Sequence, residues 1–350
     1  MKKKKICIIG LGYVGLPIAI EFSKYYEVIG FDIAEDRIKK LSRYYDANNQ
    51  FTKNELKKIK KLKFSNNEKD IKNSNIYIIT VPTPIKKNKT PDLSALSYAS
   101  KIVGKNLHKN DIIVYESTVY PGCTEDFCVP ILEKNSKLKF NKDFYCGYSP
   151  ERINPGDKKH KISNIKKITS GSKPHIATKI DKVYKQIILA GTHKVSNIKV
   201  AEAAKVIENT QRDLNIALIN ELSILFDKLK INTEEVLRAA ETKWNFLSFR
   251  PGLVGGHCIG VDPYYLTYKA KDVGYRPRII LSGREINNEM SKYVTKNFIK
   301  ELKNKSIKVK NAKILIMGLT FKENCPDLRN SGANEIIKIL KKFKCKLDLY

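Results

Sequence analysis

The 350-residue chain contains no Cys-x-x-Cys pair, and its number of cysteines is odd. A disulfide framework uses an even set of cysteines, and zinc sites commonly use closely spaced cysteine pairs. Both scaffolds are therefore disfavoured, and we expect free thiols, a reducing cytoplasmic compartment and no bound metal. The cysteines lie at positions 7, 123, 128, 146, 258, 325 and 345.

The chain also lacks a hydrophobic run long enough to cross a membrane. Its first residues, Met-Lys-Lys-Lys-Lys followed by a short apolar run, are similar to a signal peptide. Gly10 and Pro17 interrupt that run, however, and a second strand-like segment follows. We interpret this start as folded protein and expect no membrane partner.

Acidic residues are scarce relative to basic ones. The chain has 36 Asp and Glu and 66 Lys and Arg, which gives a formal net charge of +30. Such an excess of positive charge is typical of nucleic-acid-binding proteins. The lysines are spread along the whole chain, however, and form no stripe interleaved with aromatic residues. We expect no nucleic-acid partner and interpret the charge as a background that attracts an anionic small molecule.

The first strong pattern is a buried strand, Lys5–Ile9, followed at once by Gly-x-Gly-x-x-Gly and then by a helical segment. Asp32 ends the next predicted strand. This context predicts a dinucleotide site, with the pyrophosphate at the helix N-terminus and the acid accepting from the ribose hydroxyls. The acid repels a 2′-phosphate, which favours NAD over NADP. The expected cofactor residues are Gly10, Gly12, Tyr13, Val14, Gly15 and Asp32, with Arg37 either stacked near the adenosine or simply solvated.

Three polar residues, Thr83, Thr118 and Glu151, each follow the end of a predicted strand. Ligands of open parallel sheets bind at the carboxyl ends of the strands, so we expect these residues at the cleft. The Thr118 hydroxyl either enters the cleft or caps a turn. Between and beyond these strands, the pattern predicts an exposed helix over 38–61 and a last strand of the alternating series over 165–170.

The longest helical pattern runs from 195 to 229 and predicts a helix that joins two domains or forms an oligomer interface. Lys205 and Asn209 are four residues apart and therefore share a face of this helix. They form either a functional pair or an ordinary solvated pair. Arg212 adds further charge.

A glycine-rich loop surrounds one cysteine in the segment 253–265. Gly255 and Gly256 precede Cys258 closely and allow a ligand to approach the backbone. Asp262 follows the cysteine by four positions. Cys258 is either a nucleophile or an inert buried thiol.

A new strand–helix–strand pattern begins at 311, and the chain stops at its second strand. Two strands are too few to bury a helix on each face of a sheet. We interpret this segment as a truncated third domain or a short divergent form. The expected domains are 1–195 for the cofactor, 196–305 for the helical centre with the cysteine loop, and 306–350 for the incomplete third domain.

Four motifs occur together and in order: Gly10-Leu-Gly-Tyr-Val-Gly-Leu-Pro17, Ser149-Pro-Glu-Arg152, Gly255-Gly-His-Cys258 with Asp262-Pro, and Gly318-Leu-Thr-Phe-Lys322. In this combination, the chain closely resembles the UDP-glucose/GDP-mannose dehydrogenases along its whole length. The resemblance implies an α/β architecture with an N-terminal Rossmann NAD domain, a central helical dimerisation domain, and a truncated Rossmann-like nucleotide-sugar domain. It also implies a homodimer.

The segments 149–157 and 254–263 look like the branch of that family that acts on UDP-N-acetylhexosamines, UDP-GlcNAc or UDP-GalNAc. UDP-glucose members usually carry a second glutamate near Pro155, and this chain does not. The resemblance therefore implies oxidation of a UDP-N-acetylhexosamine at C6 to the uronic acid, with two NAD, for surface polysaccharide synthesis.

The family chemistry gives each motif residue a role. Cys258 attacks the aldehyde formed in the first oxidation, and the resulting thiohemiacetal is oxidised to a thioester that water hydrolyses. Lys205 and Asn209 stabilise the developing oxyanion, and Asp262 orients water or assists the thiol. Glu151 and Thr118 handle the proton through water. The implied substrate-binding residues are Glu151, Arg152, Lys205, Asn209, Arg212, Arg250, Gly255, Gly256, His257, Lys322 and Arg329.

Four alternatives remain at this stage. The chain is a UDP-glucose 6-dehydrogenase, a two-electron hydroxyacid dehydrogenase with a similar helical domain, a truncated NAD-binding chain without turnover, or a nucleic-acid binder. A hydroxyacid dehydrogenase makes one NADH per substrate and survives Cys258→Ala. Salt-dependent DNA binding that a sugar nucleotide does not compete away supports the last alternative.

Overall fold

A computed structural model describes residues 4–153, 161–256, 259–320, 328 and 330–350 of the chain. The chain divides into two compact units, Met1–Val206 and Ile207–Tyr350, with the boundary inside the long helix α7 (Ile198–Leu229). The three domains expected from the sequence stay a prediction. Among the described residues, no helix combines the length and the apolar character needed to cross a membrane.

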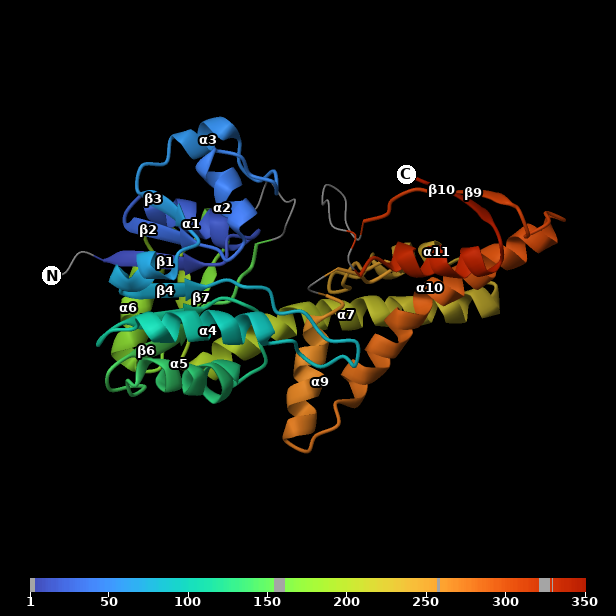
Figure 1. The fold of residues 1–350 in the computed structure, drawn as a ribbon. Helices are drawn as coiled ribbons and strands as arrows, with labels where there is room; N and C mark the ends of the chain where they lie inside the picture. The colour runs from blue at the N-terminus through green and yellow to red at the C-terminus, as the bar shows by residue number, and fades with distance from the viewer. Residues whose placement is uncertain (1–3, 154–160, 257–258, 321–327, 329) are drawn as a thin grey trace. The chain divides into compact units, whose positions relative to one another are not determined.

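The first unit is built on a parallel six-stranded sheet of order β3-β2-β1-β4-β5-β6 (Figure 1). From β1 the chain first moves outward to β2 and β3, and it then returns to add β4, β5 and β6 on the other side. The reversal between β1 and β4 is the switch point at which such sheets bind ligands. The strands are β1 (Lys5–Ile9), β2 (Glu27–Phe31), β3 (Leu62–Ser65), β4 (Ile76–Ile79), β5 (Ile112–Tyr115) and β6 (Tyr145–Tyr148).

Helices cover both faces of this sheet, which explains why the central strands are apolar at nearly every position. On one face, Phe22 of α1 and Tyr184 of α6 meet edge to face, with ring centroids 5.5 Å apart. On the other face, the Tyr115 hydroxyl is hydrogen-bonded to Ser100 of α4. The helical segments are α1 (Gly15–Ser23), α2 (Glu35–Ser42), α3 (Lys53–Lys57), η1 (Glu68–Asn73), α4 (Ser94–Asn106), η2 (Thr124–Cys128), α5 (Val129–Ser136), η3 (Ile162–Asn164) and α6 (Pro174–Tyr184).

Two sequence expectations for this unit are wrong. The segment 38–61 is not one exposed helix, because Asp46 is buried and its carboxylate accepts hydrogen bonds from three backbone N–H groups of a turn between α2 and α3. The strand expected over 165–170 is β7 (Lys167–Thr169), and it leaves the main sheet to pair with β8 (Thr192–Lys194). Local patterns do not determine which sheet a short strand joins.

The described part of the second unit contains the rest of α7, the helices α8 to α10, and the parallel pair β9 (Lys313–Ile316) and β10 (Lys346–Leu349) with α11 (Gly332–Lys342) between them. α7 packs closely on α10 at Gly283, where a Cβ atom would lie 2.4 Å from the Leu214 side chain. The cysteine loop is shorter than expected, because α9 already begins at Asp262. The three helices are α8 (Thr233–Ala240), α9 (Asp262–Asp272) and α10 (Arg278–Asn304).

Candidate functional site

The glycine loop between β1 and α1 has the geometry that a pyrophosphate needs. A Cβ at Gly15 would lie 1.8 Å from the carbonyl oxygen of Gly10, so only glycine permits this close turn, and Gly10 itself has a φ of +93°. No heavy atom lies within 4 Å of a Cβ built at Gly12, which leaves its backbone open to a ligand. The N-terminus of α1 has no side-chain cap at Val14. Its N–H groups therefore suit an anion.

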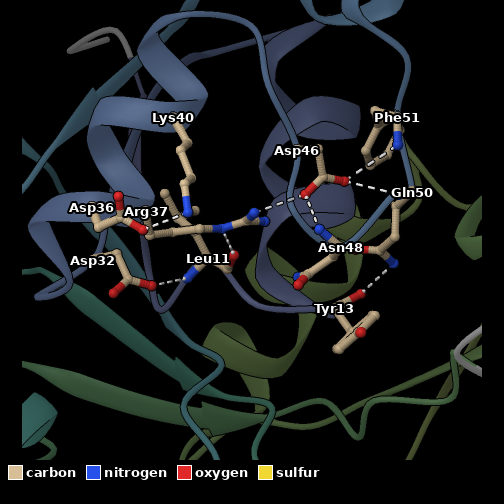
Figure 2. A network of polar contacts seen from close by, with 10 residues as sticks. All are labelled: Leu11, Tyr13, Asp32, Asp36, Arg37, Lys40, Asp46, Asn48, Gln50 and Phe51. Atoms are coloured by element: carbon tan, nitrogen blue, oxygen red, sulfur yellow. Dashed lines mark hydrogen bonds and ion pairs between the residues drawn. The ribbon is translucent and has the colours of Figure 1, made fainter. Parts of the chain in front are cut away.

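Asp32 lies where the second strand ends, close to the same loop. One carboxylate oxygen accepts a 2.8 Å hydrogen bond from the backbone N–H of Leu11 (Figure 2). The other oxygen accepts a 2.9 Å bond from the N–H of Ala34. These bonds hold an anionic acceptor beside the glycine loop. The residues present therefore fit NAD, and the acidic group opposes a 2′-phosphate.

Arg37 is not solvated, and that alternative is wrong. Its side chain is only 12% exposed. The guanidinium donates through Nε to the Leu11 carbonyl at 3.0 Å and through Nη1 to Asp46 at 2.8 Å (Figure 2). Gln50, from the turn that follows Asp46, donates to the Tyr13 carbonyl at 3.0 Å. The glycine loop is thus fixed by side chains from α2 and from the turn after it.

Thr83 and Thr118 lie together at the carboxyl edge of the sheet, after β4 and β5. The Thr83 hydroxyl donates to the Thr118 carbonyl at 2.7 Å, and the Ser117 hydroxyl donates to the Val81 carbonyl at 2.6 Å. The loops after β4 and β5 are therefore tied to each other beside the switch point. For the Thr118 hydroxyl, entry into the cleft and capping of a turn both stay predictions.

Glu151 follows β6 and faces α7. Its Oε2 lies 3.9 Å from Nζ of Lys205, whose side chain is only 6% exposed. The ordinary solvated pair expected as an alternative is therefore wrong for Lys205. The neighbouring Arg152 donates to the Lys166 carbonyl at 2.7 Å, so one of its nitrogens is engaged by the backbone.

Asn209 follows Lys205 by four residues on α7, and in the second unit it reaches Asp262. Its Nδ2 donates to the Asp262 carboxylate at 2.6 Å. Asp262 is 1% exposed and lies in the first turn of α9. This geometry joins two of the expected site residues, an amide and a carboxylate, by a hydrogen bond.

The loop before the cysteine is bound to the segment before α11. The N–H of Gly256 donates to the Asn330 carbonyl at 3.2 Å, and the Asn330 side chain donates back to the Gly256 carbonyl at 3.3 Å. Gly256 has a φ of +84°, which favours glycine, and Gly255 is half-buried beside it. Four expected site residues lie outside the described residues: His257, Cys258, Lys322 and Arg329.

Two of the arginines expected to bind the substrate, Arg212 and Arg250, are exposed residues of the second unit. Arg212 is exposed on α7. Arg250 donates to Glu241 at 2.5 Å and lies 3.0 Å from Glu234. Because Arg250 donates to it, the pKa of Glu241 falls to about 2. The structure therefore places Arg250 in an ion-pair cluster with the region around α8.

Sequence reasoning missed four buried charged or polar residues beside these candidates: Glu116, Lys167, Tyr184 and Glu202. Glu116 follows β5 directly, at the same edge as Thr118, and that position was a usable signal. No sequence pattern marked Lys167 or Tyr184 as a site residue, because the residues that they contact are distant in the sequence. Glu202 precedes Lys205 on α7 by three residues, which places it on a similar face.

Most of the chain matches known protein families. Residues 4–188, 199–289 and 315–350 match the NAD binding, central and UDP binding domains of the UDP-glucose/GDP-mannose dehydrogenase family. The UDP-N-acetyl-D-glucosamine 6-dehydrogenase of Salmonella typhi is 61% identical over 99% of this chain and 81% of that protein. The enzyme of the same name from Pseudomonas aeruginosa is 58% identical over 100% of this chain and 83% of that protein.

A solved structure has the same fold. The structure of a UDP-D-ManNAc dehydrogenase from Pyrococcus horikoshii superimposes with a TM-score of 0.92 at 33% identity. The match covers 99% of this chain and 83% of that one.

Proposed function

Because the chain belongs to the UDP-glucose/GDP-mannose dehydrogenase family, we propose that it oxidises the C6 hydroxyl of UDP-N-acetylglucosamine to a carboxylate. The observation that carries this proposal is the 61% identity, over nearly the whole chain, to a UDP-N-acetyl-D-glucosamine 6-dehydrogenase. The product, a UDP-linked uronic acid, is a building block for surface polysaccharide.

The glycine loop and Asp32 would hold NAD, with the pyrophosphate at the N-terminus of α1 and a ribose at the carboxylate. NAD, when bound, supplies the hydride acceptor for each of the two oxidations. Arg37 keeps the loop in place through the Leu11 carbonyl. Thr83 and Thr118 line the carboxyl edge of the sheet at the same point.

Cys258 serves in this proposal as the nucleophile of the second oxidation. Its sulfur attacks the C6 aldehyde, and the carbonyl oxygen becomes the hydroxyl of a thiohemiacetal. Loss of hydride from C6 and of the hydroxyl proton gives a thioester. Water then attacks the thioester, the thiol leaves, and the uronic acid is released.

Lys205 and Asn209 stabilise the negative charge that develops on the oxygen at C6 in these steps. A buried ammonium such as that of Lys205 stabilises an oxyanion more strongly than an exposed one, because water competes less. Asp262 holds the Asn209 amide through their 2.6 Å bond. Glu151 accepts the proton of the attacking water, with Thr118 in the same relay, and its carboxylate lies 3.9 Å from the ammonium of Lys205.

The sugar nucleotide is proposed to meet Arg152, Arg212, Arg250, Gly255, Gly256, His257, Lys322 and Arg329. Of these, the described arginines carry the positive charge that a diphosphate requires. We also propose a homodimer. The second unit exposes large apolar side chains that a subunit contact would bury, among them Trp244 at 92% and Ile279 at 75% exposure.

A substrate panel tests the proposal. UDP-GlcNAc, UDP-GalNAc, UDP-ManNAc and UDP-glucose are offered separately with NAD, and NADH and the acid product are measured. We expect UDP-GlcNAc to give the highest kcat/KM. Preference for UDP-glucose, or the absence of NADH with all four sugars, would contradict the proposal.

A further inference from the structure

Three side chains form a buried polar cluster beneath the turn that carries Glu151. Glu116 and Tyr184 are 0% exposed and Lys167 is 3% exposed. Their segments are far apart in the chain, since Glu116 follows β5, Lys167 begins β7 and Tyr184 ends α6. We call these three residues the buried triad.

The triad is fully connected. Nζ of Lys167 forms an ion pair with Glu116 Oε2, and the Tyr184 hydroxyl donates to Glu116 Oε1 at 2.5 Å. The Lys167 ammonium also lies 5.5 Å from the centre of the Tyr184 ring, within the range of a cation–π contact. Burial beside the Glu116 carboxylate raises the pKa of Tyr184, so this hydroxyl stays a donor at neutral pH.

The triad holds the peptide group that immediately precedes Glu151. Lys167 Nζ donates to the carbonyl oxygen of Pro150 at 3.0 Å. The N–H of Glu151 donates to the Glu116 carbonyl at 3.4 Å. One residue earlier, the Ser149 hydroxyl donates to the Ile168 carbonyl at 2.6 Å. The peptide between Pro150 and Glu151 is therefore attached to two residues of the triad.

Burying an ion pair is costly, and apolar side chains of similar size would often stabilise a fold as well or better. Apolar side chains cannot, however, donate a hydrogen bond to the Pro150 carbonyl. The ammonium of Lys167 does so, and Glu116 and Tyr184 compensate its charge and fix its position. The cluster is thus suited to orienting a peptide rather than to stability alone.

We propose that Glu116, Lys167 and Tyr184 are positioning residues that set the Glu151 carboxylate against Lys205. The contact they control is the 3.9 Å separation between Glu151 Oε2 and Lys205 Nζ. A misplacement of about 1 Å at a reacting group costs on the order of 100-fold in rate. The kinetic part of this inference rests on the proposed function, in which Glu151 moves the proton of the attacking water.

Lys167→Met is the first test, with Lys166→Met as the matched control because the Lys166 side chain is exposed. Both are made alone and in the Glu151→Gln background. We expect Lys167→Met to lower kcat by roughly 10- to 100-fold and to leave the Kd of NAD unchanged. We expect no further loss in the Glu151→Gln background, since residues that act through one group are not additive. Additive losses in the double variant would overturn the inference.

Two further variants serve if Lys167→Met does not fold. Tyr184→Phe removes a single hydrogen bond to Glu116, and we expect a several-fold loss of kcat with NAD binding intact. Lys167→Arg keeps a cation and a donor but places a larger group in the same buried space, so we expect a kcat above that of Lys167→Met and below that of the parent. If the Tyr184→Phe enzyme keeps the kcat of the parent and the same dependence of kcat on pH, the triad does not position Glu151.

A crystal structure of a folded triad variant tests the inference without turnover. We expect the separation between Glu151 Oε2 and Lys205 Nζ to differ from that in a crystal structure of the parent. An unchanged separation would overturn the positioning role even if the enzyme is active. An inactive parent, by contrast, contradicts the proposed function and leaves this structural comparison valid.

Discussion

Glu202 on α7 accepts a 2.5 Å hydrogen bond from the backbone N–H of Gly122, a residue of the loop that leads into η2. Its other carboxylate oxygen accepts a 2.9 Å bond from the N–H of Thr124. Burial raises the pKa of Glu202 from 4.5 to about 7, although these hydrogen bonds oppose the shift and the nearby Glu125 adds to it. α7 is therefore tied, one turn before Lys205, to the segment that follows Thr118.

Glu202 makes the stability of the protein depend on pH. Between pH 4.5 and about 7, the folded state holds a proton that the unfolded chain has lost, so stability falls as the pH rises through this window. The shift corresponds to roughly 3 kcal/mol. We expect Glu202→Gln to flatten this part of the pH profile of unfolding free energy. Glu221→Gln, at an exposed position of α7, is the control. If unfolding free energy changed with pH by the same amount in the parent, Glu202→Gln and Glu221→Gln, the assignment of this pH dependence to Glu202 would be wrong.

We expect Asp32 to determine the choice of cofactor. Asp32→Ser removes the carboxylate that faces a ribose and opposes a 2′-phosphate, so we expect the KM for NAD to rise by about 10-fold and the preference for NAD over NADP to fall. Steady-state kinetics with both cofactors measure the change. Asp36→Asn is the matched control, because the Asp36 side chain is 77% exposed and pairs with Lys40. Unaltered cofactor preference in Asp32→Ser would refute this role.

Arg37 supports the glycine loop. Arg37→Met removes the donors to the Leu11 carbonyl and to Asp46, and we expect a loss of about 2 kcal/mol in unfolding free energy, with weaker NAD binding. Asp46 keeps its three backbone donors, which limits the damage. Calorimetric titration with NAD and thermal unfolding measure both effects. Arg43→Met, at an exposed position after α2, should change neither quantity, and equal effects of the two substitutions would disprove the role.

We expect the stability of the second unit to depend strongly on Arg284 of α10. It donates to Asp213 of α7 at 2.6 Å, and both residues are buried. Burial raises the pKa of Asp213, and the Arg284 charge offsets part of that shift. Arg284→Met leaves a buried carboxylate without its cation, at a cost of roughly 3–5 kcal/mol in unfolding free energy.

Denaturant unfolding compares Arg284→Met with Arg278→Met, whose side chain is exposed on the same helix. The double variant Asp213→Asn, Arg284→Met removes both charges. We expect it to be more stable than Arg284→Met alone. A double variant that is less stable than the single one would contradict the argument from the unpaired charge.

The sequence predicted those parts of the structure whose causes are local. The glycine loop, α1 and Asp32 are consecutive, and the spacing of glycine and acid is sufficient to place them. The length of α7 was likewise visible, because its apolar residues recur at helical spacing over many turns.

Contacts between distant segments were not predictable in this way. The contact between Arg37 and Asp46 could not be predicted, because Asp46 follows in a turn with no regular pattern. Glu116 and Lys167 are 51 residues apart, and only the fold brings them together. A short strand such as β7 also carries no information about which sheet it joins, because its backbone bonds are satisfied equally by either neighbour.

The central claim is a four-electron oxidation through Cys258, and the ratio of NADH formed to UDP-GlcNAc consumed tests it most directly. The ratio is measured for the parent enzyme and for Cys258→Ala, with the uronic acid quantified in parallel. We expect two NADH per sugar and one equivalent of acid for the parent, and loss of acid formation in Cys258→Ala. One NADH per sugar in the parent, or acid formation by Cys258→Ala at the parent rate, would contradict the account.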